Sequence, residues 1–518
     1  MRSITDMPDR HVTIARSDSD YISFPDVCLT HGDRLICVYR VADKHVATRS
    51  RMEVRTSDDL GKTWSEPLVL ADRGHCPRLT VLEDGDVLLI TDSSPVGGAT
   101  YRSGDEGKTW SEPKATGLRH AIPDRPLRIG ESGLLTAGHR HVGKAANPLL
   151  GQATSEQVMY RSDDNGDTWS EWAPLAIDVG LVLCEVSMFK TADGSLRALL
   201  RENSGVQEPT YVMESHDEGA SWSPPEPNPT IGHRPCAGLL RSGRTLITYR
   251  HVGPNGGNRA WLGDVDTERF YAPSAYDVGN GAKLTSEALL IENGAGNEDA
   301  VAYCLRPVTD PRYATARLEA RLSVEAAEAN HCTVHLGCQW SVLPDRVLAA
   351  VPGTEPVVLD ATVPHDYVFT YDRGTVGLQV DGKARCTIDL AAAGMALDRS
   401  RRPVRFGNAP RGFPGFSPFG FERNAGKSRW YAVKLSIHEP RYGDREWAWS
   451  PTDGLPNQYE VDRILELHND GKSGLGDFGY SGWVQLPDGR VFVASHYKGE
   501  APFSYVAGYW ISEEDFQR

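Results

Sequence analysis

The chain has 518 residues, of which 40% are hydrophobic, and its formal net charge is −15. An acidic chain without a run of Lys or Arg is a poor candidate for binding the nucleic acid backbone or an anionic lipid surface. Its 51 Gly, 33 Pro and 12 Trp favour many short strands joined by turns over long helices. We therefore expect an all-β protein whose partners include neither nucleic acid nor membrane.

The N-terminal residues contain no apolar stretch of the kind found in a signal peptide. No window of the sequence approaches the roughly 18 apolar residues that a membrane span requires. The nine cysteines lie in apolar, strand-like segments and lack paired C-x-x-C spacing. We expect a cytoplasmic protein with reduced, buried thiols and with neither disulfides nor a zinc site.

Four segments in the first half of the chain share the pattern Ser-x-Asp-x-Gly-x-Thr/Ser-Trp. They are residues 57–64, 103–110, 162–169 and 215–222, and we call them the aspartate loops. In such a turn the Asp carboxylate accepts backbone N–H bonds, Gly takes a positive φ and Trp packs under the loop. The pattern predicts four outer hairpins, and it makes their acids structural groups and not catalytic candidates.

A second repeat consists of an apolar strand, a Gly-containing turn and another apolar strand. Its six copies begin at residues 24, 76, 122, 184, 234 and 479. Six copies predict six four-stranded blades, each aspartate loop lying in an outer hairpin. Radial closure of such blades gives a six-bladed β-propeller.

The sixth copy is separated from the fifth by a stretch of a different kind. Between about residues 272 and 440 the aspartate loops are absent and short alternating strands follow one another, including a hairpin that turns at Asp381 and Gly382. The strand pattern resembles a concanavalin-A-like jelly roll of the lectin type. We expect the first part of the propeller at 1–271, an inserted β-sandwich at 272–440 and the closing part of the propeller at 441–518.

In an up-and-down blade, the start of the first strand and the end of the second strand lie on the same face. In the six copies these positions carry many Arg and His residues, among them Arg40, His75, Arg201 and Arg250. Such a gathering in an acidic chain predicts a site for an anionic or polyhydroxylated ligand.

These repeats and face residues resemble the sialidase (neuraminidase) superfamily, in which the aspartate loops are called Asp-boxes or BNR repeats. In that family a carboxylate activates a tyrosine nucleophile, an aspartate is the acid/base, and three arginines clamp the substrate carboxylate. The resemblance implies that Tyr480 in DFGYSGW is the nucleophile and Glu185 in CEVSMF its activator. It implies that Asp43 in RVADKHVATR is the acid/base.

The resemblance also supplies clamp residues and one departure. Arg201 and Arg259 are similar to the second and third clamp arginines, whereas Ser23 stands where the first belongs. Losing a charged hydrogen-bond partner costs about 2–3 kcal/mol at a carboxylate site. Arg40 is the candidate that could compensate from the same strand pair. The remaining expected substrate contacts are His75, Arg250 and His45, of which His45 also rivals Asp43 as the acid/base.

The resemblance thus implies an exo-glycoside hydrolase of the sialidase type that acts on a terminal sugar. With Ser23 in place of an arginine, this sugar is expected to be either an acid other than ordinary sialic acid or a neutral glycoside. Histidines at six face positions leave open a lyase or unusual glycosidase that uses a His or Tyr base on uronate-bearing glycans. A non-catalytic glycan-binding propeller is also open, and convergence of Tyr480, Glu185 and Arg201 would argue against it. No metal or cofactor is expected, because the sequence has no HExxH, EF-hand, P-loop or GxGxxG motif.

Overall fold

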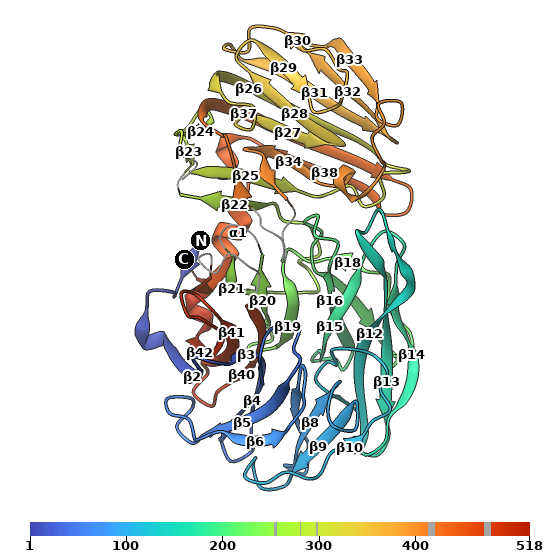
Figure 1. Cartoon of the computed structure of the whole chain (residues 1–518), viewed down its shortest axis with the longest axis vertical. Helices are drawn as coiled ribbons and strands as arrows, with labels where there is room; N and C mark the ends of the chain where they lie inside the picture. The colour runs from blue at the N-terminus through green and yellow to red at the C-terminus, as the bar shows by residue number, and fades with distance from the viewer. Residues whose placement is uncertain (253–255, 280, 297–298, 413–419, 471–477, 518) are drawn as a thin grey trace.

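The computed structural model describes residues 1–517 except 253–255, 280, 297–298, 413–419 and 471–477. Figure 1 shows a ring of sheets with a pair of larger sheets above it. In the described part of the chain the one α-helix is α1, Gln458–Arg463, and strands make up most of the remaining regular structure. The prediction of an all-β protein is confirmed.

The first three blades are continuous four-stranded sheets, each with its strands in chain order from the axis outward. Blade 1 contains β3 (Tyr21–Leu29), β4 (Leu35–Ala42), β5 (Ser50–Ser57) and β6 (Leu68–Ala71). Blade 2 contains β7 (Arg78–Val81), β8 (Val87–Thr91), β9 (Ala99–Ser103) and β10 (Lys114–Ala115). Blade 3 contains β11 (Leu127–Ile129), β12 (Gly133–Asn147), β13 (Gln152–Ser162) and β14 (Ser170–Ile177).

Blade 4 is continuous like the first three, whereas blades 5 and 6 combine strands from distant parts of the chain. Blade 4 contains β15 (Leu183–Lys190), β16 (Leu196–Glu202), β17 (Tyr211–Ser215) and β18 (Glu226–Pro227). Blade 5 contains β19 (His233–Leu239), β20 (Thr245–His251), β21 (Gly257–Gly263), β39 (Ile464–Asn469) and, parallel to β39, β1 (Arg2–Ser3). Blade 6 contains β40 (Gly479–Gln485), β41 (Val491–Tyr497), β42 (Tyr505–Ile511) and β2 (His11–Ala15).

The six-bladed propeller is therefore confirmed, and two of its joints were not predicted. Strand β2 supplies the outer strand of blade 6 and pairs with β42, so segments close to the two ends of the chain share one sheet. The long interruption falls within blade 5, between its third strand β21 and its fourth strand β39. Both joints stabilise the ring, because each blade that they complete contains strands from distant parts of the chain.

The interruption folds as two sheets that share one hydrophobic core, and we call it the two-sheet unit. One sheet has seven strands: β22 (Ser274–Val278), β25 (Ala300–Leu305), β34 (Val404–Gly407), β27 (Thr333–Leu336), β28 (Cys338–Leu343), β29 (Arg346–Ala349) and β30 (Val357–Val358). The other has eight: β23 (Ala282–Leu284), β24 (Leu289–Asn293), β37 (Gly426–Glu439), β26 (Thr315–Ala327), β31 (His365–Asp372), β32 (Thr375–Val380) and β33 (Lys383–Asp389) in order, with β38 (Gly443–Trp449) also on β37. Rings contact one another across the gap, Trp340 with Phe369 at 5.7 Å and Phe406 with Trp430 at 5.0 Å between centres. Because β38 pairs with β37, the unit extends past residue 440, where the sequence had placed its end.

The aspartate loops have the predicted internal bonding and lie between the third and fourth strands of blades 1 to 4. In the first loop, Asp59 accepts hydrogen bonds from the Thr63 amide at 2.9 Å and the Thr63 hydroxyl at 2.6 Å. The indole of Trp64 donates to the Gly61 carbonyl at 3.0 Å. Positive φ is taken by Gly61 and also by Leu60 before it. Since each carboxylate is occupied within its own turn, the acids of these loops serve the fold.

Each blade departs from regular pairing at one residue near the start of its inner strand. The six residues have φ between 43° and 56°, the left-handed region that side-chain-bearing residues rarely adopt. They are Phe24, Cys76, Ile122, Glu185, Arg234 and Tyr480. The register shifts at this point in β3, β15, β19 and β40, which marks a β-bulge. We call these six the axial residues.

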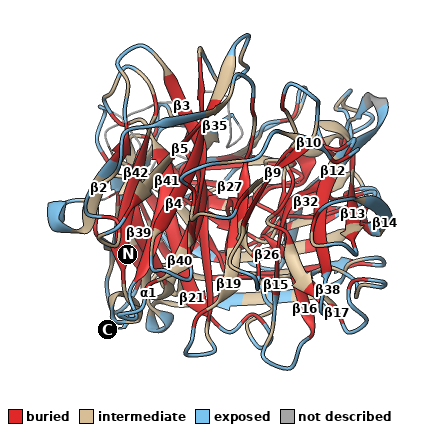
Figure 2. Cartoon of the chain, turned by 90° about the horizontal axis from the view of Figure 1, so that it is seen from below, coloured by how far each residue is buried: buried red, intermediate tan, exposed pale blue. Residues whose placement is uncertain are grey.

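Two residues after the axial position, a polar side chain often bonds to the inner strand of the next blade. Asp26 accepts from the Leu79 amide at 2.8 Å, Asp124 from the Met188 amide at 2.6 Å, and the Ser187 hydroxyl from the Ala237 amide at 3.0 Å. Figure 2 shows that buried residues follow the strands and that exposed ones lie mainly in the loops. The inner strands are thus joined blade to blade inside the ring.

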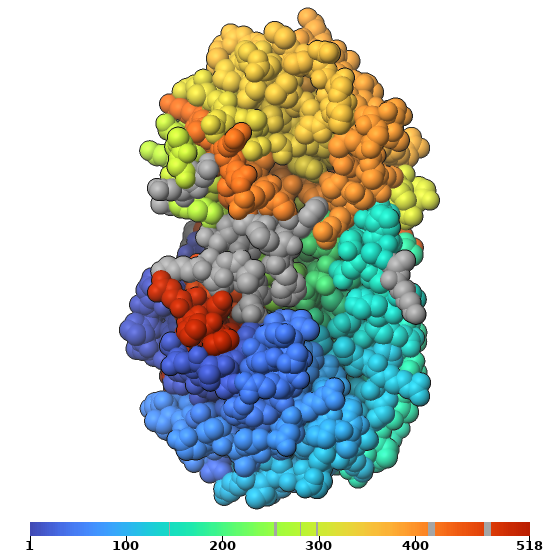
Figure 3. Space-filling model, in the orientation of Figure 1, coloured from blue at the N-terminus to red at the C-terminus, as the bar shows by residue number. Residues whose placement is uncertain are grey.

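The propeller and the two-sheet unit are joined by a buried ion pair. Arg402 donates to Glu208 at 2.9 Å, and both side chains have no exposed surface. Arg402 also donates to the Leu149 carbonyl at 3.1 Å. Figure 3 shows the two bodies in contact at the right, where orange atoms of the two-sheet unit meet teal atoms of the propeller.

All nine cysteines are unpaired, and eight of them are buried, as the sequence predicted. Across the ranges that the structure describes, no helix has both the length and the apolar character needed to cross a bilayer.

Asp26 is the strongest of the joints inside the ring and provides a test of the fold. Its fully buried carboxylate accepts hydrogen bonds from the Arg125 guanidinium, with one at 3.0 Å, and lies 3.5 Å from Arg78. Breaking a buried ion pair by removing one partner costs about 3–5 kcal/mol. We therefore expect Asp26→Asn to lower the free energy of unfolding by about that amount in denaturant titrations at neutral pH. Asp58→Asn, which breaks the exposed pair with Arg34, is the matched control and should cost less than about 1 kcal/mol.

The same variant has a defined pH dependence. Burial alone would raise the pKa of Asp26, but Arg125 and Arg78 outweigh burial and hold it below its ordinary value. Its contribution to stability is present above the unfolded pKa of about 3.9 and is lost as pH falls through the lower folded pKa. The difference between wild type and Asp26→Asn should therefore be full at pH 7 and shrink below about pH 4. A difference that grows on acidification would contradict this account.

Candidate active site

The axial residues come from six different blades, and their side chains meet one another. Phe24, Cys76, Ile122 and Tyr480 share one small hydrophobic cluster, and the Phe24 and Tyr480 rings lie 4.8 Å apart edge to face. The Arg234 guanidinium lies 5.3 Å from the centre of the Tyr480 ring. Blades of a ring converge only at its axis, so these contacts place the six side chains around the axis. The left-handed bulge therefore turns each side chain toward the centre.

The most ordered part of this cluster joins Tyr480, Glu185 and Arg201. The Tyr480 hydroxyl donates to Glu185 Oε1 at 2.7 Å. Arg201 Nη1 donates to Glu185 Oε2 at 2.7 Å and lies 3.5 Å from the Tyr480 oxygen. Arg201 pairs with Cys184 across β15 and β16, which places it directly beside the bulge that carries Glu185. The structure thus brings together the three side chains whose convergence the sequence analysis treated as diagnostic.

Electrostatics give this pair a defined proton arrangement. Burial favours the neutral acid of Glu185, but Arg201, His139 and Arg234 outweigh it and lower its pKa to about 2. Burial and the neighbouring Glu185 carboxylate raise the pKa of Tyr480, although Arg201 opposes them. At neutral pH a protonated phenol therefore donates to an ionised carboxylate. A hydroxyl group that is activated by a general base starts from this arrangement of protons.

Two more guanidinium groups surround the phenol. Arg250 lies 5.7 Å from the Tyr480 ring centre and contacts His233 Nδ1 at 3.1 Å. Arg234 donates through Nη2 to the Pro123 carbonyl at 3.0 Å. Its Nη1 is buried and has no hydrogen-bond partner among the described residues. Together with Arg201, these side chains make the axis strongly positive in a chain that is acidic as a whole.

Blade 2 contributes an oriented histidine on another side of the axis. His75 Nδ1 lies 3.0 Å from Asp92, and Asp92 is fixed by a 2.8 Å hydrogen bond from the Ile122 amide. The other ring nitrogen of His75 lies 3.5 Å from the Cys76 sulfur. Burial opposes the charge on the imidazole, but Cys76 and Asp92 together raise the pKa of His75 above its ordinary value. His75 therefore has a proton to give at neutral pH.

Blade 1 places Arg40 beside Ser23, the position where the resemblance required an arginine. Arg40 donates through Nε to the Ser23 hydroxyl at 3.3 Å and lies 4.5 Å from the Phe24 ring centre. It also donates to the His45 carbonyl at 2.9 Å, and the His45 ring lies 2.9 Å from the Tyr21 hydroxyl. Ser23 has no exposed surface. A guanidinium is thus present at this edge of the axial cluster, supplied by the neighbouring strand.

Asp43 is arranged differently from what the resemblance implied. Both of its carboxylate oxygens accept bonds from its own loop, from the Thr48 hydroxyl at 2.5 Å, the Thr48 amide at 2.9 Å and the Arg49 amide at 3.3 Å. The Thr48 hydroxyl bond is the largest influence, and the pKa of Asp43 lies well below its ordinary value. A carboxylate held in this way closes a loop, and a lowered pKa opposes the work of a general acid.

Arg259, expected from the resemblance as a clamp residue, is bound by a carboxylate that the sequence analysis had not selected. Arg259 Nη1 donates to Glu460 of α1 at 2.7 Å, and the same carboxylate accepts from the Ala275 amide at 3.1 Å. The ion pair therefore ties blade 5 to the first strand of the two-sheet unit. This pair could not be inferred from the sequence, because Glu460 lies about two hundred positions beyond Arg259.

Sequence reasoning placed Arg234 and the His75 partner Asp92 among the face positions of the repeat, but it did not include them among the expected catalytic or substrate-binding residues. A signal for both was available in the repeat. Arg234 occupies the same place in its copy as Glu185 and Tyr480 do in theirs, and Asp92 ends the second strand of the copy that His75 opens. In the described ranges, no group of three or more His, Cys, Asp or Glu side chains is placed to hold a metal ion.

A family model described as a BNR repeat-like domain matches residues 53–262. This segment contains all four aspartate loops. No match was found among curated proteins.

Solved structures show distant similarity. A protein of unknown function from Dyadobacter fermentans is 22% identical over 57% of this chain and 93% of its own, with a TM-score of 0.45. Trypanosoma rangeli sialidase in complex with sialic acid is 11% identical over 82% of this chain and 94% of its own, with a TM-score of 0.32. Xylan β-1,4-xylosidase from Bacillus halodurans is 12% identical over 83% and 89%, with a TM-score of 0.35. Because these TM-scores are below 0.5, the fold and the candidate site are assigned from the chain's own strands and side chains.

Proposed function

We propose that this protein is a glycoside hydrolase of the sialidase type that removes a terminal acidic sugar from a glycan. The observation that carries the proposal is the hydrogen bond between the Tyr480 hydroxyl and Glu185, 2.7 Å long and buried among arginines at the propeller axis. Tyrosine nucleophiles with a carboxylate partner are a known exception among glycosidases, which otherwise use two carboxylates. A purely glycan-binding propeller would have no need of this buried pair.

In the first step the Tyr480 oxygen attacks the anomeric carbon while the bond to the leaving oxygen breaks. Glu185 accepts the phenolic proton, so the nucleophile gains strength without becoming a free buried phenolate. A general acid protonates the leaving oxygen. In the second step the same group, now a base, takes a proton from water. The water oxygen attacks the anomeric carbon, and the bond from that carbon to the Tyr480 oxygen breaks. Glu185 then returns its proton to Tyr480.

Recognition of an acidic sugar rests on the guanidinium groups around the phenol. Arg201 donates through one nitrogen to Glu185, but the buried Nη1 of Arg234 has no partner among the described residues, and Arg250 lies 5.7 Å from the Tyr480 ring centre. A carboxylate on the sugar would satisfy these donors in a site from which water is largely excluded. Arg40 adds positive charge at the edge near Phe24. This arrangement differs from the three-arginine clamp expected from the resemblance, which supports a substrate other than an ordinary sialoside.

For the acid/base, we propose His75 oriented by Asp92 in place of Asp43. His75 carries a raised pKa and stands beside the axial Cys76, whereas Asp43 closes its own loop. The same dyad would also serve a lyase, in which a base removes a ring proton next to a uronate carboxylate. A lyase makes an unsaturated sugar that absorbs in the ultraviolet, so the products distinguish the two reactions.

Loss of the axial pair should abolish turnover without unfolding the protein. Glu185→Gln removes the general base, and we expect kcat on a cleavable acidic aryl glycoside to fall by about 10²–10⁴. Tyr480→Phe removes the nucleophile and should lower kcat at least as far. Tyr39 and Glu53 form a matching buried pair 3.1 Å apart away from the axis. Tyr39→Phe and Glu53→Gln should leave kcat within a few-fold of wild type, and an equal loss in these controls would remove the support for the axial pair.

The assignment of the acid can be tested with leaving groups of different basicity. A poor leaving group needs protonation, whereas 4-nitrophenolate leaves without it. We therefore expect His75→Gln to slow hydrolysis of an alkyl glycoside by about 10²-fold or more and to affect the 4-nitrophenyl glycoside far less. Asp43→Asn should affect both substrates equally. If instead only Asp43→Asn slows the alkyl glycoside more than the 4-nitrophenyl glycoside, Asp43 is the acid and His75 has no role in protonating the leaving group.

A further inference from the structure

The seam between the propeller and the two-sheet unit is incompletely packed. There the structure leaves a cavity of about 650 Å³, lined on the propeller side by Tyr211 of β17, Glu226 of β18, Arg269, Phe270, Tyr271 and Pro273. Arg306 and Trp447 line it from the two-sheet unit. Protein interiors rarely leave voids larger than a water molecule, and pockets of 300–1,000 Å³ at domain interfaces are typical ligand sites. No axial residue lines this cavity.

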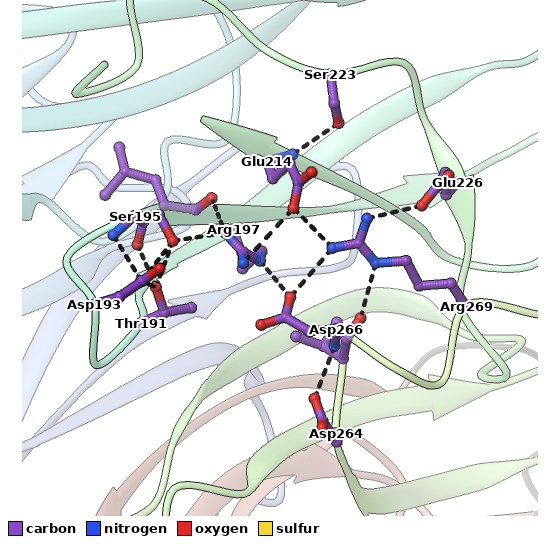
Figure 4. Close-up of polar contacts among 12 residues, drawn as sticks. Thr191, Asp193, Ser195, Arg197, Glu214, Ser223, Glu226, Asp264, Asp266 and Arg269 are labelled. Carbon is purple, nitrogen blue, oxygen red and sulfur yellow. Dashed lines mark hydrogen bonds and ion pairs between the residues drawn. The ribbon is translucent and has the colours of Figure 1, made fainter. Parts of the chain in front are cut away.

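The propeller wall of the cavity is rigidly held. Figure 4 shows Arg269 between Glu214, Glu226 and Asp266, to which it donates at 2.8, 2.8 and 3.2 Å. Asp266 also accepts from Arg197 at 2.6 Å, so the network continues into blade 4. Nearby, Asp178 accepts from Arg441 at 3.0 Å and from the Tyr442 hydroxyl at 2.5 Å, which fixes the opposite wall. The cavity is preformed by paired charges and does not need a ligand to shape it.

One guanidinium in this lining is left with unmet donors. Arg269, Arg441 and Arg445 each have a carboxylate partner. Arg306 has none within ion-pair distance in the part of the chain that the structure describes. Its Nη2 donates to the Tyr211 hydroxyl at 3.3 Å, and its Nε is buried with no hydrogen-bond partner. A buried, unpaired charged donor is costly, so the position favours an anionic ligand.

The apolar part of the lining favours a flat ligand. Phe270 is 40% exposed, an unusual exposure for a phenylalanine, and Tyr271 and Trp447 line the same cavity. Aromatic rings offer broad apolar faces beside polar groups, which suits the carbon face of a pyranose. The exposed carboxylate of Glu446 adds an acceptor for sugar hydroxyls.

We propose that the seam cavity binds an acidic oligosaccharide, with the sugar carboxylate on Arg306 and a pyranose ring against Phe270 and Trp447. The choice of an acidic glycan rests on the proposed function, because the axial site is argued to act on the same chemistry. The cavity would hold a part of the glycan that is not cleaved. Two sites on one chain would raise the local concentration of substrate at the axis.

The test is isothermal titration calorimetry, which measures how many probe molecules bind per chain. The protein is the full chain carrying Glu185→Gln, which blocks turnover. The probes are trigalacturonic acid and 3′-sialyllactose, with lactose as the neutral control. We expect one of the acidic probes to bind with a stoichiometry of two. Phe270→Ala or Arg306→Gln, added to Glu185→Gln, should reduce the stoichiometry to one or weaken one site at least tenfold. Trp172→Ala removes a similarly exposed aromatic residue outside the cavity and should change nothing.

The outcomes separate this proposal from the proposed function. If one probe molecule binds per chain and Phe270→Ala abolishes this binding, the result supports the seam site and counts against sugar binding at the axis. A stoichiometry of one that is unaffected by Phe270→Ala and Arg306→Gln overturns the seam site and leaves the axial site standing. If neither acidic probe binds, the seam site is also overturned. Because Phe270 is exposed, its replacement keeps the test valid even if Arg306→Gln disturbs folding.

Discussion

The active centre depends on one backbone constraint, the left-handed residue that every blade carries near the start of its inner strand. A side chain in this conformation costs roughly 1–2 kcal/mol relative to an ordinary one, and six blades each bear that cost with a residue other than glycine. In a regular strand, successive side chains point to opposite faces of the sheet. The left-handed residue breaks this alternation, and its side chain points toward the axis. A regular strand would have directed Glu185 and Tyr480 into the spaces between blades. Strain of this kind persists only where the surroundings determine the backbone fully, and it is concentrated at functional sites.

The surroundings that hold the bulges are the joints inside the ring. Asp26, Asp124 and Ser187 each bind the inner strand of the following blade two residues after the axial position. Strand β2 closes blade 6 and the two-sheet unit leaves from blade 5, so the ring cannot open without breaking sheets. This rigidity lets the protein keep an ionised carboxylate, a phenol and three guanidinium groups together in a buried place. A more mobile frame would relax to separate these charges or admit water, and the preorganised electrostatics that such chemistry uses would be lost.

Much of the fold could be predicted because it repeats. The aspartate loops and the six strand pairs predict the number of blades. The equivalent positions of the repeat also predict that Tyr480, Glu185 and Arg201 lie together, although almost three hundred residues separate the first two. Features that depend on a single contact could not be predicted. The sequence marks Asp43 only as a loop acid, and its hydrogen bonds to Thr48 and Arg49 appear only in the folded chain. The ion pair between Arg259 and Glu460 likewise could not be inferred from the sequence. The end of the two-sheet unit was misplaced because β38 shows the same alternation as a propeller strand, and only its pairing with β37 assigns it.

The central claim, that Tyr480 is the nucleophile at the axis, is tested most directly by trapping its adduct. A glycosyl fluoride of the cleaved sugar, carrying a second fluorine beside the anomeric carbon, reacts quickly with a nucleophile and releases the sugar slowly. Mass spectrometry of the intact protein and of its peptides would then locate the label. The account predicts one sugar per chain, attached to Tyr480 and absent in Tyr480→Phe. A label on another side chain such as Cys76, or full turnover of the fluoride without any adduct, would contradict it.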